Sequence, residues 1–407
     1  DVNNVAPPGA TITVLGQIIA KHVTVHATDD DDTITIGVVN GAAEMKVHAG
    51  DGDDSVNVGT PAPGTVDAIS GSLFVYGEDG TDTLNVEDTA DGNANAGILT
   101  PTTITGLDMA GSITYDSFAM LNIRLVTGGD TFTIKGTHAG TTIANGNDGD
   151  DVVNIEAISG PTTVNGGNGS DTFNVGASVR SVDAIDATLT IGGNAPTSGS
   201  DWLYVDDSSD STDNTGALTS ATITGLGMAV GITYDTIEHL VISLGSGDDA
   251  FTINSTHGAA TSPFQEETTL NTGAGADTVD VEDVTDKLFV NGENDADTVN
   301  VDGTGTGSIS TLSGGAGNDI FNIQAMNGAV NVDGGADDDI VNAGSSPVNP
   351  EKPFVFTMPE AAVGTTVIQG SSPLASSKGR DVTVAGPFPP GTTAIQVAAE
   401  FPVEGGS

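Results

Sequence analysis

Apolar and polar residues alternate in short runs along most of this chain, and a glycine-rich acidic turn precedes many of these runs. In Asp171–Val175 the order Asp-Thr-Phe-Asn-Val places apolar side chains at positions 173 and 175, and the run after Asp319 has the same spacing. A period of two is expected for a β-strand with one buried face. No long 3.6-residue pattern occurs, and the abundant residues Gly and Thr are poor helix formers. The pattern predicts an all-β protein.

The aspartate that opens each run recurs at a nearly regular interval. The commonest step is 20–22 residues, and the two steps of 48 residues equal about two turns of a coil with a small insertion. A period near 20 built from glycine turns and short strands is typical of a stacked solenoid. We therefore expect a parallel β-helix or β-roll whose opening aspartates lie at positions 32, 54, 82, 130, 151, 171, 201, 249, 277, 297, 319 and 339.

A longer repeat is superimposed on the short one. The sequence Thr-Ile-Thr-Gly-Leu at 103–107 recurs at 222–226, and His138 recurs as His257, each after 119 residues. A block of several turns has therefore been duplicated. Duplication of a whole block, including its insertions, is more useful to a spacer or surface protein than to a protein with one active site.

The two ends of the chain differ from the repeats. Residues 1–20 contain one alternating run, Thr11–Leu15, and are expected to form a lead-in or cap strand. The solenoid is expected over 21–345, and the proline-containing segment 346–353 is expected to be a linker. Residues 354–407 contain four short alternating runs and fewer acidic residues, which favours part of an Ig-like β-sandwich that lacks its remaining strands.

The charge of the chain limits its partners. Its 56 acidic and 9 basic residues give a formal net charge of −47, which argues against nucleic acids and anionic membrane surfaces. A disordered acidic chain is excluded because 37% of the residues are hydrophobic and alternate regularly. The chain has no Cys, which excludes disulfides and thiolate metal sites. No apolar run reaches the roughly 18–20 residues of a membrane-spanning helix.

The turns carry a recognisable motif. Residues 166–174 and 314–322 both read Gly-Gly-x-Gly-x-Asp-x-apolar-x, and partial copies begin at Gly50, Gly146, Gly245, Gly273 and Gly334. This motif resembles the RTX (haemolysin-type) calcium-binding nonapeptide of secreted bacterial proteins. The resemblance covers about residues 27–343, and it implies a parallel β-roll whose loops bind several Ca²⁺ ions between consecutive turns.

This chain departs from the RTX pattern in one respect. RTX nonapeptides occur in tandem and give a calcium loop on both edges of each turn, whereas here one such loop occurs in every 20 or so residues. The opposite edge carries ordinary turns such as Ile158–Pro161. We therefore expect at most one edge of the coil to hold metal ions.

Elementary chemistry also favours calcium. Ca²⁺ prefers six to eight oxygen ligands from carboxylates and carbonyls, and glycines allow the sharp turns that aim carbonyls at an ion. Stacked carboxylates about 5 Å apart would repel one another strongly without cations. The expected ligands are Asp51, Asp53, Asp54, Asp79, Asp82, Asp130, Asp148, Asp150, Asp151, Asn168, Asp171, Asp248, Asp249, Asp277, Asp295, Asp297, Asn318, Asp319, Asp337 and Asp339.

The abundance of acidic residues is also compatible with two roles that need no metal. The acids can stabilise turns and prevent sideways aggregation. They can also reflect adaptation to high salt, although they concentrate in the turns instead of being spread evenly. The insertions 83–100 and 202–219 carry further acids such as Asp206 and Asp213, and these segments are expected to be solvated loops.

Evidence for an enzyme is weak. Basic residues are scattered, and the one cluster consists of His26, Lys46 and His48, which we expect to form a surface ladder. His138 and His257 follow equivalent strands of the duplicated block, which favours a structural role. The alternative is a carbohydrate-active or glycan-binding β-helix, in which two of the many acids act as a catalytic pair. An ice-binding solenoid would need regular Thr-x-Thr rows, which the sequence lacks.

The sequence thus predicts a calcium-stabilised extracellular structural protein without catalytic activity. A bacterial surface-layer, adhesin, matrix or filament component fits the duplicated scaffold. The expected partners are further copies of the chain, joined head to tail or by strand addition, or components of the cell surface or matrix. Neither nucleic acid nor a membrane span is expected.

Overall fold

The chain is built from β-strands. The computed structural model describes residues 11–16, 20–41, 43–59, 64–90, 92–194, 200–258, 266–324 and 327–343, together with residues 2–3, residue 9 and four short strands after residue 343. Regular structure within these ranges is β-strand, which confirms the all-β prediction. The described residues contain no helix with the length and hydropathy needed to cross a membrane.

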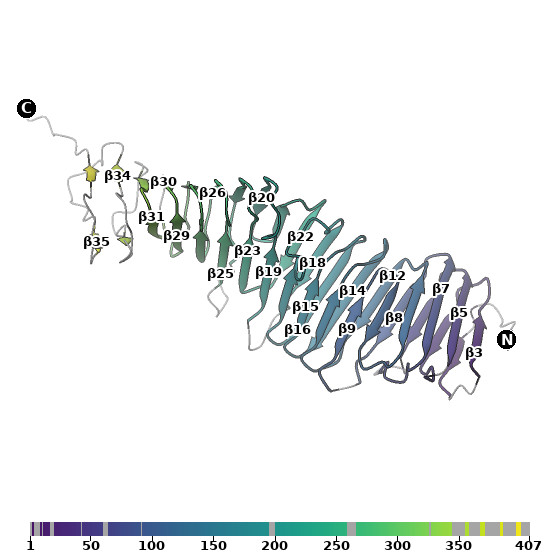
Figure 1. Ribbon diagram of the computed structural model, residues 1–407. Helices are drawn as coiled ribbons and strands as arrows, with labels where there is room; N and C mark the ends of the chain where they lie inside the picture. The colour runs from purple at the N-terminus through teal and green to yellow at the C-terminus, as the bar shows by residue number, and fades with distance from the viewer. Residues whose placement is uncertain are drawn as a thin grey trace, which may run out of the picture. The chain divides into compact units, whose positions relative to one another are not determined.

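The chain forms two compact units. Unit 1 comprises residues 1–203 and 228–237, and unit 2 comprises residues 204–227 and 238–407. In each unit the strands lie side by side in two sheets, and outside two short antiparallel stretches the chain passes from one sheet to the other with each strand (Figure 1).

Unit 1 contains most strands of the N-terminal half. Its first sheet holds β1 (Val2–Asn3), β3 (His22–His26), β5 (Glu44–Asp51), β7 (Ser72–Asp79), β9 (Ala96–Leu99), β10 (Thr103–Gly106), β11 (Ser112–Asp116), β13 (Thr131–Ile134), β15 (Val152–Ile155) and β17 (Thr172–Val175). Its second sheet holds β2 (Thr11–Val14), β4 (Thr33–Ile36), β6 (Ser55–Val58), β8 (Thr83–Glu87), β12 (Met120–Arg124), β14 (Thr141–Asp148), β16 (Thr162–Asn168), β18 (Thr188–Gly192) and β22 (Gly231–Asp235). β19 (Trp202–Asp206) spans the point where the chain leaves unit 1.

Unit 2 repeats the arrangement. Its first sheet holds β23 (His239–Ser243), β25 (Glu267–Asn271), β27 (Lys287–Asn291), β29 (Ile309–Ala316), β31 (Ala329–Ala336), β33 (Val355–Thr357) and β35 (Thr383–Ala385). Its second sheet holds β20 (Thr215–Leu218), β21 (Thr222–Gly225), β24 (Ala250–Ile253), β26 (Thr278–Val281), β28 (Thr298–Val301), β30 (Ile320–Ile323), β32 (Ile340–Ala343), β34 (Val367–Gly370) and β36 (Gln396–Ala399).

Each turn of the coil, here called a rung, stacks on the next through parallel strand pairing. In unit 1, β15 pairs in parallel with β13 and β17, and β14 pairs in parallel with β12 and β16. In unit 2, β28 pairs in the same way with β26 and β30. Parallel stacking of consecutive turns is the defining feature of a β-solenoid, so this part of the fold prediction is also confirmed.

The alternating pattern of the sequence fills a thin interior. β15 and β17 alternate half-buried and buried residues, with the second and fourth positions inside. Phe132, Val153 and Phe173 lie in register on three successive rungs and are almost completely buried. Burial of each such side chain stabilises the fold by about 1.5–3 kcal/mol.

An inserted hairpin interrupts the regular coil in unit 1. After β8 the chain forms β9, β10 and β11 in the first sheet, where β10 is antiparallel to both neighbours. β11 then stacks on β7, while β9 stacks on β13. The segment 83–100 therefore contains β8 and β9, and 202–219 contains β19 and β20, so the expectation that both are solvated loops is wrong.

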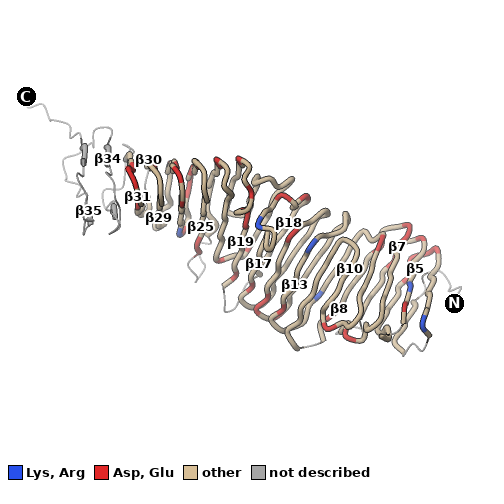
Figure 2. Tube along the Cα trace, in the orientation of Figure 1, with Lys and Arg blue, Asp and Glu red and all other residues tan. Residues whose placement is uncertain are grey.

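The insertion moves the acidic loops to the other edge of the coil. Before it, loops containing Asp54 and Asp82 lead from the first sheet to the second; after it, loops containing Asp151 and Asp171 lead from the second to the first. Figure 2 shows acidic turns at the upper edge near β5 and β7 and at the lower edge below β13 and β17. Each of these rungs thus carries its acidic loop on one edge, and that edge changes along unit 1 because the hairpin shifts the repeat by half a turn; the expectation that at most one edge holds metal ions stays a prediction.

The strands after residue 343 do not pair as the sequence analysis expected. β33 pairs in parallel with β31 and β35, and β34 pairs in parallel with β32 and β36. These pairings continue the two sheets of the solenoid, whereas a β-sandwich would require antiparallel neighbours. The expected linker 346–353 and most of 354–407 lie outside the described residues.

Candidate metal centre

A hydrogen-bonded ladder of aspartates runs along the edge that carries the acidic loops. In nine cases the backbone N–H of an opening aspartate donates to Oδ1 of the opening aspartate on the next rung, at 2.7–3.0 Å. We call this arrangement the Asp ladder. It links Asp32, Asp54 and Asp82; then Asp130, Asp151, Asp171 and Asp201; and, in unit 2, Asp249, Asp277, Asp297, Asp319 and Asp339.

The glycine-rich sequence of the loop makes the ladder sterically feasible. In the loop before Asp171, Gly167 and Gly169 have φ values of 120° and 144°, which residues with a side chain rarely adopt. A Cβ atom on Gly166 would overlap Oδ2 of Asp171. The same overlap would occur between Gly314 and Asp319. The first glycine of the motif therefore leaves the space into which the aspartate folds back.

In eight of the twelve ladder residues the second carboxylate oxygen is buried and lacks a hydrogen-bond partner among the described residues. A buried, unpaired carboxylate oxygen is costly, so it requires a proton or a cation. The chemistry of the donor set, carboxylate oxygens beside tightly turned backbone, fits a hard cation such as Ca²⁺. The oxygens concerned are Oδ2 of Asp54, Asp82, Asp151, Asp171, Asp249, Asp277, Asp297 and Asp319.

Burial also shifts the acidity of these groups. It raises the pKa of Asp297 to about 8, and the charges of Asp277 and Asp319 add to the rise. Burial raises the pKa of Asp151 to about 7 and that of Asp171 to about 6. Without a cation, part of the ladder therefore keeps protons at neutral pH, which is unusual for aspartate.

A second set of carboxylates comes from the exposed residue just before each ladder aspartate. Asp150 accepts a hydrogen bond at Oδ1 from the N–H of Ser170 on the next rung, at 2.8 Å. Its charge adds to the burial that raises the pKa of Asp171, so the two carboxylates are close. The space between these two rungs thus contains one exposed carboxylate from the first loop and one buried carboxylate from the second.

Five such spaces occur in the described residues, and we call them paired gaps. In each, the exposed carboxylate accepts an N–H of the next rung, and its charge adds to the burial that raises the pKa of the ladder aspartate there. They are formed by Asp31 with Asp54, Asp53 with Asp82, Asp150 with Asp171, Asp213 with Asp249, and Asp248 with Asp277.

Other gaps lack a carboxylate at the position just before the ladder aspartate, although the charges of Asp295 and Asp337 add to the burial that raises the pKa of Asp297 and of Asp319. Ala276 and Ala296 occupy its position below Asp297 and Asp319, and Gly129 does so below Asp151. Below Asp339 the position is held by Asn318, whose Oδ1 accepts the N–H of Asp338 at 3.0 Å. The ladder is thus continuous through these gaps, while the exposed partner varies.

The twenty predicted ligands fall into two equal groups. Ten are buried members of the Asp ladder: Asp54, Asp82, Asp130, Asp151, Asp171, Asp249, Asp277, Asp297, Asp319 and Asp339. The other ten are exposed at the loop tips: Asp51, Asp53, Asp79, Asp148, Asp150, Asn168, Asp248, Asp295, Asn318 and Asp337. Asp53, Asp150 and Asp248 belong to paired gaps.

The remaining tip residues have different roles in the structure. Asn168 donates through Nδ2 to Oδ1 of Asp148 at 2.7 Å. Asp295 and Asp337 have φ values of 71° and 74° at a loop position that glycine occupies elsewhere. Because Asp tolerates this left-handed conformation better than most residues, their presence is explained by the turn.

Several residues of the site were not predicted from the sequence. Asp31 and Asp213 are the exposed members of two paired gaps. Asn95 and Asn214 begin two stretches of the ladder, donating their backbone N–H to Asp130 and Asp249 at 2.8 and 2.7 Å. Asn95 and Asn214 are 119 residues apart, so the duplication was the signal that could have revealed their equivalence.

The basic cluster forms a ladder of its own on unit 1. The rings of His26 and His48 stack with centroids 4.7 Å apart, and His48 stacks on Tyr76 at 4.9 Å. Nδ1 of His48 lies 2.7 Å from Oε1 of Glu78. This agrees with the predicted surface ladder. Burial lowers the pKa of His138, which packs edge-on against Tyr115.

Comparison with known proteins adds one distant likeness. No protein-family model matches the chain, and no curated protein matches it. A similar solved structure is described as the X-ray crystal structure of a hyperactive, Ca²⁺-dependent, beta-helical antifreeze protein from an Antarctic bacterium. It is 17% identical, the match covers 88% of each chain, and the TM-score is 0.24. A likeness at this level says nothing about the ligands of the present chain.

Proposed function

We propose that this chain is a calcium-stabilised, non-catalytic β-solenoid that serves as a structural segment of an extracellular bacterial protein. The observation that supports it best is the buried Oδ2 of Asp171, which has no hydrogen-bond partner among the described residues and lies beside the carboxylate of Asp150. One divalent cation in each paired gap would neutralise two carboxylates and supply the partner that the buried oxygen lacks.

The ion would act as a clamp between consecutive rungs. The exposed carboxylate belongs to one loop and the buried carboxylate to the next, so a shared ion ties the two loops together. Binding to the folded chain alone stabilises it by mass action, because the unfolded chain does not bring the two carboxylates together. The calcium supplies charge neutralisation and cross-linking, and the chain supplies the oxygen ligands.

Calcium is favoured over magnesium because the oxygen atoms that the loops offer differ in kind and have no regular octahedral arrangement. The loops offer carboxylate, amide and backbone oxygens in a flexible arrangement, whereas Mg²⁺ requires near-ideal octahedral geometry and gives up its water reluctantly. The likeness to RTX loops supports the same ion. The paired gaps of this chain would limit the proposed binding sites to five of the spaces between consecutive loops.

A structural role is supported by the duplication of a large part of the chain. The duplicated 119-residue block repeats the inserted hairpin and the start of a new stretch of ladder, as Asn95 and Asn214 illustrate. Such repetition extends a scaffold. Extracellular calcium modules bind with dissociation constants of about 10⁻⁴–10⁻³ M, so calcium would order the chain after it leaves the cell. A surface-layer, adhesin, matrix or filament component fits these properties.

Calcium binding is tested by circular dichroism and thermal melting of the chain in EDTA, then with millimolar CaCl₂ or MgCl₂. We expect a large rise in melting temperature with Ca²⁺ and a much smaller one with Mg²⁺, and about five bound ions per chain by isothermal titration calorimetry. An unchanged melt would refute the calcium proposal and leave turn formation as the role of the acids.

The assembly part of the proposal needs a separate measurement. Sedimentation velocity in calcium should reveal species larger than the 40.5 kDa monomer at high protein concentration. A chain that stays monomeric at high concentration in calcium would count against head-to-tail or strand-addition assembly. Its calcium-dependent melting would be unaffected by that outcome.

A further inference from the structure

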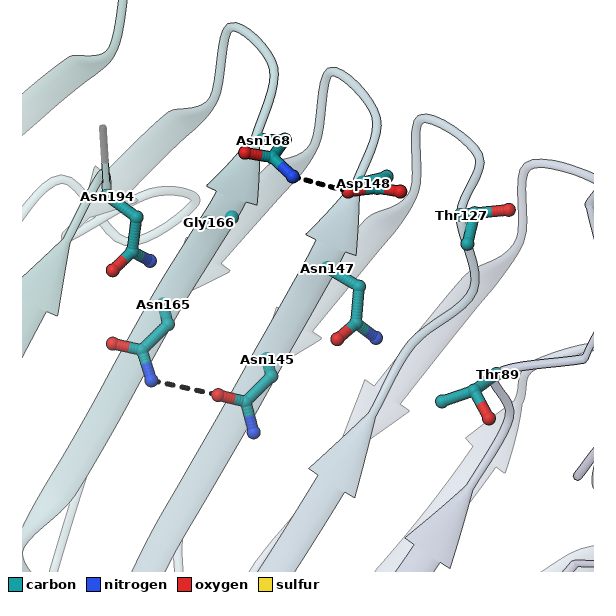
Figure 3. A pocket seen from close by; sticks show the side chains of 10 residues that line it. Thr89, Thr127, Asn145, Asn147, Asp148, Asn165, Gly166, Asn168 and Asn194 are labelled. Carbon is teal, nitrogen blue, oxygen red and sulfur yellow. Dashed lines mark hydrogen bonds between the residues drawn. The ribbon is translucent and has the colours of Figure 1, made fainter. Parts of the chain in front are cut away.

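A polar groove of about 620 Å³ lies on unit 1, where β14 and β16 of the second sheet turn into their acidic loops. Figure 3 shows Asn145 and Asn165 side by side, with Thr89 and Thr127 on one side and Asn194 on the other. A volume of about 300–1,000 Å³ is usual for sites that hold small molecules or short polymer segments. The lining of the groove contains no basic or aromatic side chain among the described residues.

Hydrogen bonds fix the amides of the groove in defined orientations. Nδ2 of Asn165 donates to Oδ1 of Asn145 at 2.8 Å, and Nδ2 of Asn168 donates to Oδ1 of Asp148 at 2.7 Å. Each amide has two N–H donors and two acceptor lone pairs. The amino group of Asn145 and the carbonyl oxygen of Asn165 make no side-chain hydrogen bond within the described residues, so both are available to a ligand.

A glycine lies beside two asparagines that line the groove. Gly192 is the register partner of Asn165 on the next strand, β18, where another asparagine would extend the row. A Cβ atom at Gly192 would lie 3.3 Å from Oδ1 of Asn165 and 3.9 Å from Oδ1 of Asn194. The absence of a side chain therefore leaves a space between two amide oxygens.

We infer that this groove binds a neutral polysaccharide segment. Sugar hydroxyls donate and accept hydrogen bonds at the same time, and the row of amides and threonine hydroxyls offers both functions. An apolar ligand would find no apolar or aromatic side chain among the described residues that line the groove, and the charge of −47 disfavours a polyanion. Preorganised amides suit a hydroxyl-rich ligand because little side-chain entropy is lost when it binds.

This inference goes beyond the proposed structural role, because it adds a ligand to one face of the scaffold. It does not depend on the paired gaps, since Asp150 and Asp171 do not line the groove. A calcium-stabilised solenoid without glycan binding and one with it are therefore distinguishable by experiment.

The test is native affinity electrophoresis of the full chain in calcium, in gels that contain dextran, mannan or a soluble β-glucan, with alginate as the anionic comparison. We expect at least one neutral polysaccharide to retard the chain. Gly192→Val fills the space and Asn165→Ala removes the exposed oxygen, and each should weaken the interaction at least tenfold. Gly192 lies in a strand without a positive φ, so the substitution does not strain the backbone.

The matched control is Asn174→Ala. Asn174 donates to Asn154 at 2.9 Å in an equivalent amide row on the first sheet, outside the groove, so its replacement should leave retardation unchanged. Retardation by none of the neutral polysaccharides, or by alginate alone, would overturn the inference. So would equal loss in all three variants. Calcium-dependent melting, measured in parallel, shows whether a variant has lost its fold or only its ligand.

Discussion

Paired gaps and unpaired gaps share the same buried ladder and differ in one exposed residue. Asp171 and Asp297 both accept a backbone N–H from the previous rung and donate their own to the next, at 2.8–2.9 Å, and both have a buried Oδ2 without a hydrogen-bond partner among the described residues. Asp171 has the Asp150 carboxylate beside it, whereas Asp297 has Ala276 at the equivalent position.

In our proposal, this difference separates gaps that only stack from gaps that also hold a calcium ion. Since the ladder continues through both kinds of gap, the buried aspartates are part of the fold, in the same way as the stacked Phe and Val residues inside. The exposed carboxylate is dispensable for stacking, because alanine replaces it in two gaps of unit 2. It is therefore the residue that decides, in our proposal, whether a rung boundary holds a calcium ion.

Replacing all five exposed carboxylates should have the largest effect. The variant carries Asp→Asn substitutions at Asp31, Asp53, Asp150, Asp213 and Asp248. One ion bound at a hundredfold excess over its dissociation constant stabilises the folded chain by about 2.7 kcal/mol, so five ions give on the order of 13 kcal/mol. We expect the calcium-dependent rise in melting temperature to disappear, while the melting temperature in EDTA rises because five charges that repel the ladder carboxylates are removed.

The control for this variant removes five charges elsewhere on the loop tips. Asp→Asn substitutions at Asp29, Asp51, Asp79, Asp148 and Asp295 reduce the net charge equally but replace no carboxylate of a paired gap. Calorimetry should still count about five ions. If both variants lose calcium binding to the same extent, the ions are held by the overall charge and the distinction between gaps is wrong.

The pH dependence of the calcium-free chain should be opposite to that of most proteins. The folded pKa of Asp297 is about 8 and that of Asp339 about 7, both above the ordinary value of 3.8. Between about pH 4 and pH 8 the folded state therefore binds more protons than the unfolded state, and its stability falls as the pH rises. Burial lowers the pKa of His138 and His257, which opposes the trend only below about pH 6.5.

Melting in EDTA at pH 5 and pH 8 measures this effect. We expect the melting temperature to be at least about 5 °C higher at pH 5. In saturating calcium the order should reverse, because protons compete with the ion for the carboxylates of the paired gaps. The same slope with and without calcium would mean that the ladder does not take part in metal binding.

Alanine at the first glycine of the motif should destabilise both kinds of rung equally in EDTA. Gly166→Ala affects the paired Asp171 and Gly314→Ala the unpaired Asp319, and in both the new Cβ overlaps a ladder carboxylate. Overpacking of this kind costs about 1–3 kcal/mol. Urea unfolding measures the change, and Gly41→Ala, whose Cβ would lie 3.6 Å from its nearest neighbour, is the control.

In calcium the two glycine variants should diverge. Gly166→Ala should lose one bound ion in addition to its packing cost, whereas Gly314→Ala should keep the ion count of the unmodified chain. Equal ion counts for the two variants would contradict the assignment of the ions to paired gaps.

The strands and the rungs could be predicted from the sequence because both are determined by residues close together in the chain. The alternation at Asp171–Val175 sets the strand and its buried face, and the 20-residue step sets the rung. The inserted hairpin was not predicted, since the antiparallel pairing of Ile104 with Leu99 and Ile113 depends on contacts across three strands that no period reveals. The hairpin shifts the repeat by half a turn, and this shift puts acidic loops on both edges of unit 1.

The sequence predicted which acidic and amide residues lie in the loops. It did not predict which of them are buried in the ladder and which are exposed at the loop tips. Burial separates Asp151 from its neighbour Asp150, although both are aspartates in the same loop. The hydrogen bond from the N–H of Ser170 to Asp150 joins residues 20 positions apart on consecutive rungs. The sequence of one loop does not show that Asp150 faces the following rung. Asp295 and Asp337 remain predicted ligands that also occupy a left-handed turn position, and both positions favour the same residue type.

The smallest and most direct prediction adds a metal site. Ala276→Asp places a carboxylate at the exposed position below Asp297, which reproduces the relation of Asp248 to Asp277. In calcium at tenfold the dissociation constant, the new ion should stabilise the chain by about 1.4 kcal/mol and raise the calorimetric ion count by one. In EDTA the same variant should be less stable than the unmodified chain, because its new charge faces Asp297 without a cation.

Ala316→Asp is the matched control, since Ala316 is exposed on a loop of unit 2 two rungs further along but does not occupy the position just before a ladder aspartate. It adds the same charge and should add no ion. Together the two variants separate the effect of position from the effect of charge. If both raise the ion count, any acid at a loop tip is enough to bind an ion. If neither does, the buried carboxylate of Asp297 is not available to a metal. A gain confined to Ala276→Asp would show that a single exposed residue converts a structural rung boundary into a calcium site.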